Sequence, residues 1–294
     1  MRRATVGGTV LVVLGVLGSA VPAHAQATFG VDLDLFSSYV WRGLTLTNKP
    51  VLEPAVWVSF PAGNASITAG GWANIDIGKY DDASDISESG GTSAFNLAEF
   101  DPYAEVSFPV GNATLTGGVT GYIYPNDDPG LTSDFNTWEI YGKAGLDVPL
   151  SPELSIYYDI DKIKGAYIEG NISHSLAASE KVSIDLGAAA GFSAGQDANL
   201  DDLGEPQEEF FNFAENGFTH LDLSAGVPFT AGVFSITPVI HFVINGDELT
   251  KITSFDETTG FPNSKDAKIW GGVSLSWSNE EEEEEQPEAP ASPE

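Results

Sequence analysis

Apolar and polar residues alternate with a period of two along most of this chain. Between Trp138 and Val148, every second residue is apolar or small, while the intervening positions include Glu139 and Lys143. Successive side chains of a β-strand point to opposite faces, so this pattern predicts a strand with one apolar and one polar face. A helix would need apolar residues three and four positions apart, and the stretch does not have them.

The same alternation predicts twelve strands, which is an even number. They span residues 29–42, 51–60, 65–77, 99–108, 113–124, 137–148, 153–162, 165–177, 180–192, 219–229, 232–244 and 267–277. Short connections (61–64, 109–112, 149–152, 178–179, 230–231) alternate with longer ones (43–50, 78–98, 125–136, 193–218, 245–267). Only the connection 162–165 is short at a place where this alternation predicts a long connection.

Short turns on one side, long loops on the other and an even strand number are typical of up-and-down outer-membrane barrels. A closed barrel satisfies every backbone N–H and C=O inside hydrocarbon. Strands of about 10 residues, each rising about 3.3 Å and tilted about 45°, span roughly 25 Å. The sequence therefore predicts an all-β fold, an up-and-down antiparallel transmembrane β-barrel of about 12 strands.

Both ends of the chain are expected to lie outside the barrel. Arg2 and Arg3, the apolar run 10–17 and the Ala23-His-Ala25 motif are typical of a signal peptide, residues 1–25, cleaved near Ala25. A membrane-anchoring helix would need about 20 apolar residues, and glycine and proline interrupt this run earlier. Residues 279–294 are rich in glutamate and proline and predict a disordered acidic tail, which leaves the barrel as residues 26–278.

Composition narrows the possible functions. The chain has 294 residues, with 43 Asp and Glu against 12 Lys and Arg, and no cysteine. Nucleic-acid binding needs clustered basic residues, so no nucleic-acid partner is expected. The absence of cysteine excludes disulfides, thiolate metal sites and cysteine nucleophiles. With 42% hydrophobic residues, the chain is not expected to be disordered throughout.

Aromatic residues recur at the predicted strand ends. Amphipathic rings favour the membrane–water boundary. We therefore expect Phe60, Phe108, Phe229 and Trp277 to form a periplasmic aromatic girdle on the side of the short connections, and Tyr39, Trp41 and Trp138 to form an outer one. The alternative is that these rings cap the core of a soluble sandwich.

If the apolar face meets lipid, the polar face lines the lumen. The charged residues predicted there are Asp32, Asp34, Arg42, Glu53, Asp76, Glu99, Asp101, Glu105, Glu139, Lys143, Asp159, Asp161, Glu169, Asp185, Asp222 and Lys268. So many carboxylates cannot share a dry core with so few cations, so the lumen is predicted to be wet. Such a lumen would attract cations and repel anions, and would pass small cationic or neutral solutes. Alternatively, the acidity is a trait of the whole protein and this narrow barrel is plugged.

Catalytic and metal-binding signals are weak. The acidic stretch from Asp197 to Glu208 partly resembles a calcium loop, but Asp202 stands where such a loop needs glycine. His174 lies between two serines, whose side chains would point to the opposite face of the strand. We therefore predict no metal, no cofactor and no catalytic residue, so that the protein is not an enzyme.

The segment 36–55 resembles the opening of the TorF-type family of outer-membrane porins. That family shows a Ser-x-Tyr-Val-aromatic-Arg-Gly-hydrophobic-Ser/Thr stretch followed by a proline-containing strand, and this chain matches it with Ser37 or Ser38, Tyr39, Val40, Trp41, Arg42, Gly43, Leu44 and Thr45. The resemblance implies a pore in the outer membrane of a Gram-negative bacterium and supplies neither catalytic residues nor a substrate. Arg42 would be a lumen cation in an acidic ring, or an ordinary partner of a carboxylate at a strand end.

One departure from outer-membrane barrels concerns the insertion signal. Such barrels commonly end in an aromatic residue that is recognised during insertion, and here the acidic tail follows Trp277. Either the barrel-insertion machinery recognises Trp277 internally, or the tail serves in the periplasm.

Three hypotheses stay open at this point. The first is a passive diffusion channel in the lipid bilayer of the outer membrane. The second is a non-conducting surface, structural or adhesion barrel, whose lumen is closed by an inward-folded loop such as 193–218. The third is a soluble secreted β-sandwich, in which the apolar rows would pack inward against each other.

Overall fold

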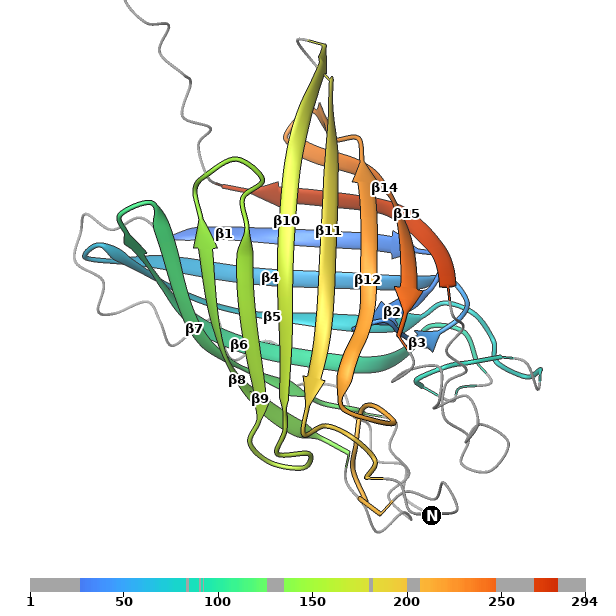
Figure 1. Cartoon of the computed structure of the whole chain (residues 1–294). Helices are drawn as coiled ribbons and strands as arrows, with labels where there is room; N and C mark the ends of the chain where they lie inside the picture. Colours follow the sequence, from blue (N-terminus) through green and yellow to red (C-terminus); the bar gives the residue numbers. More distant parts are fainter. Residues whose placement is uncertain are drawn as a thin grey trace, which may run out of the picture.

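Twelve antiparallel strands close into one barrel (Figure 1). The computed structural model describes residues 27–82, 85–89, 91, 93–125, 135–179, 182–199, 207–246 and 267–279. The barrel strands in this part of the chain are β1 (Thr28–Phe36), β4 (Val51–Ala62), β5 (Ala65–Asp76), β6 (Asn96–Val110), β7 (Ala113–Tyr122), β8 (Thr137–Leu146), β9 (Glu153–Asp159), β10 (Ala166–Ser179), β11 (Val182–Ala194), β12 (Gly217–Gly226), β14 (Phe234–Asn245) and β15 (Ala267–Ser278). Within the same ranges, no helix is long and apolar enough to cross a membrane.

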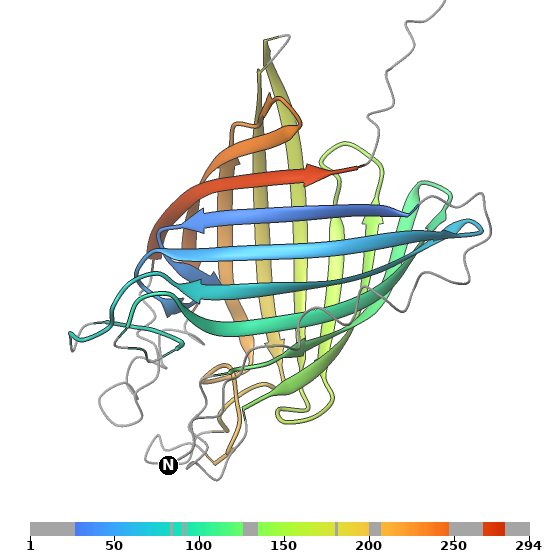
Figure 2. The ribbon, with the colours of Figure 1, turned by 180° about the vertical axis from the view of Figure 1, so that it is seen from behind.

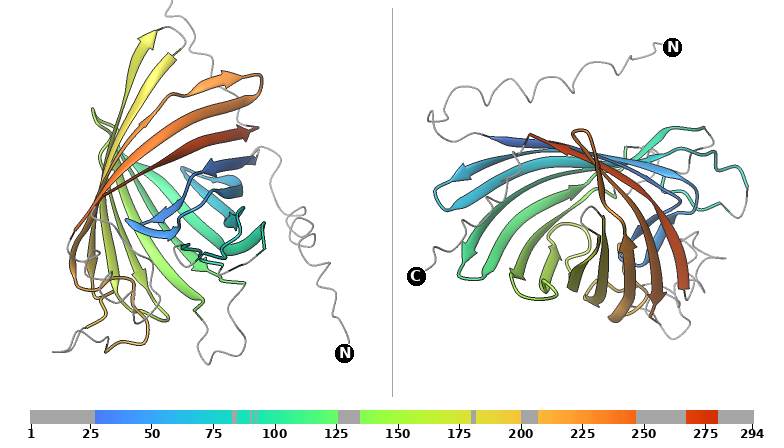
Figure 3. Two further views of the ribbon diagram at one scale, coloured as in Figure 1. Left: turned by 90° about the vertical axis from the view of Figure 1, so that its right-hand side faces the viewer. Right: turned by 90° about the horizontal axis from the view of Figure 1, so that it is seen from above.

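Each barrel strand pairs with the next one along the chain, and the first pairs with the last. β1 lies between β4 and β15, so that Leu33 is opposite both Pro54 and Leu275. Figure 2 shows β15 in red beside β1 in blue, and in Figure 3 the strands wrap around a common axis. Because the ring closes, it has no free edge, which is the condition for crossing hydrocarbon with strands.

The apolar rows face outward. On β1, Val31, Leu33 and Leu35 are 44%, 38% and 50% exposed, whereas Asp32 and Asp34 between them are half-buried on the inner face. The other strands repeat this arrangement, and a continuous apolar exterior of this kind needs lipid rather than water around it. The predicted twelve-stranded up-and-down barrel is therefore confirmed, and the inward apolar packing of the soluble sandwich is not found in the described residues.

The first predicted strand, 29–42, is wrong as a single strand. β1 ends at Phe36, and β2 (Tyr39–Trp41) pairs with β3 (Leu44–Thr47) in a separate two-stranded sheet. Arg42 and Gly43 join the paired residues Trp41 and Leu44 and have φ angles of 48° and 86°. Two-residue hairpin turns with positive φ at both central residues match the twist of the strands, and glycine adopts this conformation without strain.

Two other predicted strands extend three residues beyond the observed strand ends. The stretch 219–229 is divided, because β12 ends at Gly226 and Phe229 belongs to the short strand β13 (Phe229–Ala231), which pairs with β14. β9 ends at Asp159 rather than at residue 162. The Asp159 carboxylate accepts hydrogen bonds from the backbone N–H groups of Asp161, Ile163 and Lys164, and these bonds stabilise a tight turn instead of further strand.

The two ends of the barrel sequence meet on the side of the short connections. The backbone N–H of Phe29 donates to Asn279 Oδ1 at 2.6 Å, and the N–H of Asn279 donates to the carbonyl oxygen of Phe29 at 3.1 Å. The predicted signal peptide, and all of the predicted acidic tail except Asn279, lie outside the described residues and stay predictions.

Candidate functional site

The β2–β3 hairpin folds into the barrel, toward the ends of the strands that carry the long connections (Figure 3). The Tyr39 hydroxyl donates to Glu99 Oε2 at 2.9 Å, and Lys268 Nζ donates to Thr45 Oγ1 at 3.0 Å. Burial and the charge of Glu99 raise the pKa of Tyr39, so that its hydroxyl keeps the proton it donates. The hairpin is thus tied to inward-facing residues of β6 and β15, two strands on the barrel wall.

Arg42, at the tip of the hairpin, forms a buried ion pair with Glu139 of the barrel wall. Its guanidinium donates from Nη1 to Glu139 Oε1 at 2.9 Å and from Nη2 to Glu139 Oε2 at 2.7 Å, with side chains only 6% and 2% exposed. The guanidinium carbon lies 4.3 Å, 4.9 Å and 4.1 Å from the ring centres of Trp41, Tyr157 and Tyr167. Two parallel charge-assisted hydrogen bonds with stacking rings are a geometry that arginine satisfies and lysine cannot.

Further donors complete the surroundings of Glu139. The Tyr122 hydroxyl donates to Glu139 Oε2 at 2.9 Å, and the Gln196 side chain contacts Oε1 at 3.5 Å. Burial lowers the pKa of Arg42, but the charge of Glu139, its hydrogen bonds with Arg42 and the influence of Tyr122 and Tyr167 together outweigh burial and leave that pKa above its ordinary value. The guanidinium therefore stays charged, and of the two sequence-based alternatives for Arg42 the structure shows a carboxylate partner, 97 residues away on β8.

The segment after β5 packs beside the hairpin. Asp76 accepts hydrogen bonds from Thr47 of β3 at 3.0 Å and from Ser87 at 2.6 Å, and the backbone N–H of Glu88 donates to Thr47 Oγ1 at 3.3 Å. Burial, followed by the negative charge of Glu99, raises the pKa of Glu88 well above its ordinary value. A carboxyl group in this position favours its protonated form.

Part of the predicted long connection 193–218 reaches the same end of the barrel. Leu44 of the hairpin, Tyr167, Phe213 and Ala214 form one buried cluster, in which the rings of Tyr167 and Phe213 stack with centroids 6.2 Å apart. The described part of this connection therefore packs against the hairpin. Together, these segments narrow the lumen on the side of the long connections.

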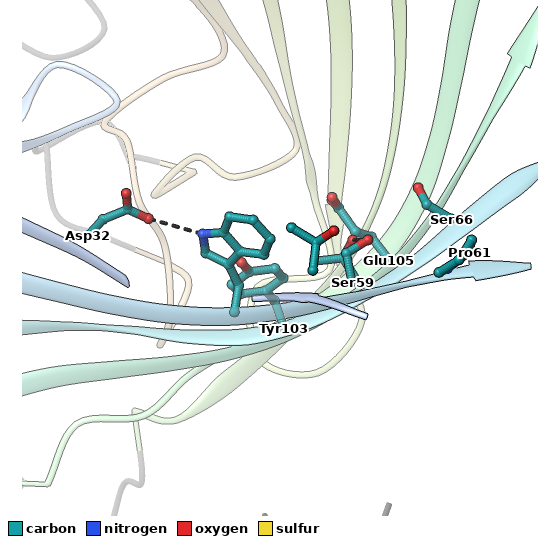
Figure 4. Close-up of a pocket in the computed structure, with 9 residues that line it drawn as sticks. Asp32, Ser59, Pro61, Ser66, Tyr103 and Glu105 are labelled. Carbon is teal, nitrogen blue, oxygen red and sulfur yellow. Dashed lines mark hydrogen bonds between the residues drawn. The ribbon is translucent and has the colours of Figure 1, made fainter. Parts of the chain in front are cut away.

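A cavity of ≈ 650 Å³ opens from the lumen wall toward the short-connection side (Figure 4). Its wall is formed by β1, β4, β5 and β6, and includes two aromatic residues, Trp57 and Tyr103, and two carboxylates, Asp32 and Glu105. Trp57 Nε1 donates to Asp32 Oδ2 at 3.3 Å. The Tyr141 hydroxyl on β8 donates to Glu105 Oε2 at 2.8 Å.

Most of the charged residues predicted for the lumen occupy inward-facing strand positions, alternating with exposed apolar residues. These are Asp32, Asp34, Glu53, Asp76, Glu99, Asp101, Glu105, Glu139, Lys143, Asp159, Glu169, Asp185, Asp222 and Lys268. Arg42 reaches the lumen from the hairpin rather than from the wall. Asp161 is a correction, because it is exposed in the turn after β9. What these residues contribute to selectivity stays a prediction.

The aromatic girdle needs one correction. Phe60, Phe108, Phe229 and Trp277 share the outward register near the short connections, and the ring of Trp277 packs edge-on against Phe29 at 5.4 Å. Trp138 is 40% exposed on the outer face near the other end. Tyr39 and Trp41, however, are not on the outer face, because the hairpin carries them into the lumen.

The histidines form no nucleophilic arrangement with the serines considered from sequence. His174 of β10 is opposite Leu186 on the outer face, so Ser173 and Ser175 point to the other face. His241 contacts Asp222 at 2.9 Å and stacks on Trp270 at 4.0 Å between ring centres. No group of three or more metal-ligating side chains is found in the described ranges, and Asp201, Asp202 and Glu205 of the calcium-like stretch lie outside them.

Sequence reasoning missed two features. The first is the inward hairpin, whose signal was the Arg-Gly pair between two apolar residues, a turn-compatible dipeptide inside an apparently continuous strand. The second is a set of lumen glycines, each paired across the sheet with an aromatic residue. Those pairs depend on strand register, which the alternation alone does not specify.

These observations define the class of the protein: it has the architecture of an outer-membrane β-barrel, with an apolar exterior, a polar lumen and an inward hairpin at one end. The chain belongs to the family described as "Bacterial protein of unknown function (Gcw_chp)", which matches residues 20–197. The resemblance to the TorF-type family stays a prediction. No curated protein sequence matches the chain.

Solved structures similar to this chain include several outer-membrane proteins. The COG4313 outer membrane channel from Pseudomonas putida F1 is 12% identical, with a TM-score of 0.46 over 88% of this chain and 97% of that one. The β domain of the Bordetella autotransporter BrkA is 13% identical, with a TM-score of 0.34 over 86% and 98% of the two chains. OccK8 (OprE) of Pseudomonas aeruginosa is 10% identical, with a TM-score of 0.31 over 76% and 69%. Similarity at this level transfers no residue role.

Proposed function

We propose that this protein is a passive diffusion channel for small hydrophilic solutes in the outer membrane of a Gram-negative bacterium. The observation that carries the proposal is the separation of faces, with apolar rows outside and rows of charged and hydroxyl side chains inside. Buried charges without enough partners would be costly in a dry interior, whereas a hydrated lumen accommodates them. The proposal includes no chemical step and no cofactor.

The charge balance of the lumen favours cations. The inward strand positions named above hold twelve carboxylates, and within the described ranges only Lys143 and Lys268 oppose them from the wall. The Arg42 guanidinium and Glu139, which is one of these twelve carboxylates, neutralise each other and leave eleven carboxylates against two lysines. A channel lined in this way concentrates cations and excludes anions, so cationic and neutral solutes are the proposed cargo.

The proposed partners are the lipids and the machinery that inserts barrels. The outward rows would contact acyl chains, and the outward aromatic residues near the short connections, including Trp277, would lie at the membrane surface. Trp277 on the last strand is the residue we propose the insertion machinery recognises.

Planar-bilayer recording of the purified full-length protein tests this proposal. Under a KCl gradient, we expect steady ohmic steps and a reversal potential on the side of potassium. Neutralising two lumen carboxylates together, as in Asp185→Asn with Asp222→Asn, should shift that potential toward zero. A reversal potential favouring chloride would overturn the cation preference.

One observation favours a second candidate, a non-conducting surface or structural barrel. The hairpin and parts of two long connections pack together inside one end of the lumen, and the buried Arg42–Glu139 pair ties the hairpin to β8. The two candidates differ in what release of the hairpin does. Silence from inserted wild-type protein, together with steady currents from Arg42→Ala, would indicate a sealed barrel and refute the open channel.

A further inference from the structure

Three glycines on the inner wall each lie directly opposite an aromatic residue of the neighbouring strand. Gly30 pairs with Trp57, Gly70 with Tyr103 and Gly118 with Tyr141. A Cβ atom at any of these glycines would overlap the ring of its partner. The missing side chain therefore lets each ring lie along the wall, over the glycine, instead of standing across the lumen. Trp57 and Tyr103 both line the cavity, and Figure 4 shows Tyr103 in its wall.

The charged side chains that line the cavity, Asp32 and Glu105, are both carboxylates. Among the described residues, Asp32 accepts a hydrogen bond from Trp57 and Glu105 accepts one from Tyr141, and a carboxylate has acceptor sites for about four. Ser59 and Thr68 add hydroxyl groups that are hydrogen-bonded to each other at 3.0 Å. The described residues that line the cavity include no lysine, arginine or histidine.

We propose that this cavity is a binding subsite for amino sugars, meaning ring-shaped polyhydroxylated solutes that carry an ammonium group. The apolar face of the sugar ring would lie on Trp57 and Tyr103, and the ammonium group would donate to Asp32, with Glu105 adding negative charge to the same cavity. A volume of ≈ 650 Å³ falls within the range of about 300–1,000 Å³ that is typical of small-molecule sites. The assignment rests on the proposed channel function for its biological role, but binding itself does not require conduction.

Each part of the site argues against a simpler ligand. A hydrated inorganic cation would bind the carboxylates, but it would make no use of the rings of Trp57 and Tyr103 that lie along the wall. A neutral sugar would use the rings and the hydroxyls, but it would leave two carboxylates in one recess without a compensating charge. An amino sugar satisfies the rings, the hydroxyl groups and the negative charge together.

Calorimetric titration of the full-length protein in detergent tests the subsite independently of any current. Glucosamine at about pH 6, where its amine is protonated, is the probe. N-acetylglucosamine supplies a similar ring without the charge, and KCl at equal ionic strength supplies charge without the ring. We expect saturable binding of glucosamine that is at least ~10-fold tighter than any binding of N-acetylglucosamine, and no saturable heat from KCl. The same probe should reduce potassium current in bilayers if the barrel conducts.

The variants separate a local site from general lumen charge. Asp32→Asn should weaken glucosamine binding by about 10-fold, whereas Asp185→Asn, which removes the same charge from β11 outside the cavity, should leave it unchanged. Trp57→Leu should weaken binding by a similar factor, and heat-dependent electrophoretic mobility checks that each variant is folded. If Trp57→Leu does not fold, the comparison of the two aspartate variants still decides the question.

Three results would overturn the subsite: no saturable glucosamine binding, equal affinity for N-acetylglucosamine, or equal losses in Asp32→Asn and Asp185→Asn. Failure of the channel proposal looks different. Inserted protein that carries no potassium current, but binds glucosamine with the expected variant pattern, would refute the channel and keep the subsite.

Discussion

Arg42→Ala tests whether one ion pair holds the hairpin inside the barrel. The substitution leaves the Glu139 carboxylate buried without its bidentate partner, and the two side chains are only 6% and 2% exposed in the intact protein. Removing one member of a buried pair typically costs about 3–5 kcal/mol, because the remaining charge is uncompensated. Since about 1.4 kcal/mol corresponds to a tenfold change, opening of the hairpin should become about 100-fold to several thousand-fold more frequent.

Amide hydrogen exchange measured by mass spectrometry reports that opening directly. Peptides covering β2 and β3 should exchange faster by this factor, while peptides from the ends of β10 and β11 near the short connection, such as residues 172–179 and 182–188, keep their protection. Lys143→Ala is the matched control, because it removes a lumen cation that lies 5.0 Å from the ring centre of Tyr141. The double variant Arg42→Met with Glu139→Leu should recover part of the protection, since it leaves no buried charge unpaired.

The reasoning is refuted if Arg42→Ala and Lys143→Ala change the exchange of the hairpin equally. It is refuted as well if β2 and β3 stay fully protected in Arg42→Ala. Either result would mean that the apolar contacts around the hairpin hold it in place without the ion pair.

Three further predictions concern pH, the lipid face and the lumen glycines. Burial and the charge of Glu99 raise the folded-state pKa of Glu88, so its contribution to stability is complete below the ordinary glutamate pKa and is lost as pH rises through the raised value. The protection factor of the Glu88 amide, in which the base-catalysed rise of intrinsic exchange is divided out, should therefore fall over that interval, and Glu88→Gln should remove this fall. Val56 is 58% exposed on the outer face of β4, so Val56→Lys should lower the free energy of unfolding by about 2–4 kcal/mol, measured by urea unfolding from lipid vesicles. The same change at the inward-facing neighbour Ala55 should lower it much less. Equal losses would contradict the assignment of faces. Gly30→Ala should push the ring beside it off the wall and cost about 1–3 kcal/mol in the same assay, and an unchanged stability would show that the wall has room for a methyl group there.

The sequence alone determined the barrel and the direction of its faces. Alternation with a period of two is a local property, so the stretch around Glu139 and Ile140 states by itself which residues share a face. The apolar face could be assigned to lipid because the polar face carries many carboxylates, and these could not have been buried together in a dry core. The predicted strand ends were less accurate. The turn after β9, for example, depends on hydrogen bonds to the Asp159 carboxylate, which the alternation does not encode.

The tertiary structure decided what fills the lumen and where its rings lie. Tyr39 and Trp41 fit the alternating pattern of a wall strand. They lie inside the lumen instead, because the hairpin that carries them is bound through Arg42 to Glu139 on β8, far along the chain. Likewise, Gly30 and Trp57 become partners only through the register of β1 with β4. Side-chain periodicity arises within a few residues of one strand, whereas pairing across a barrel depends on closure of the whole ring.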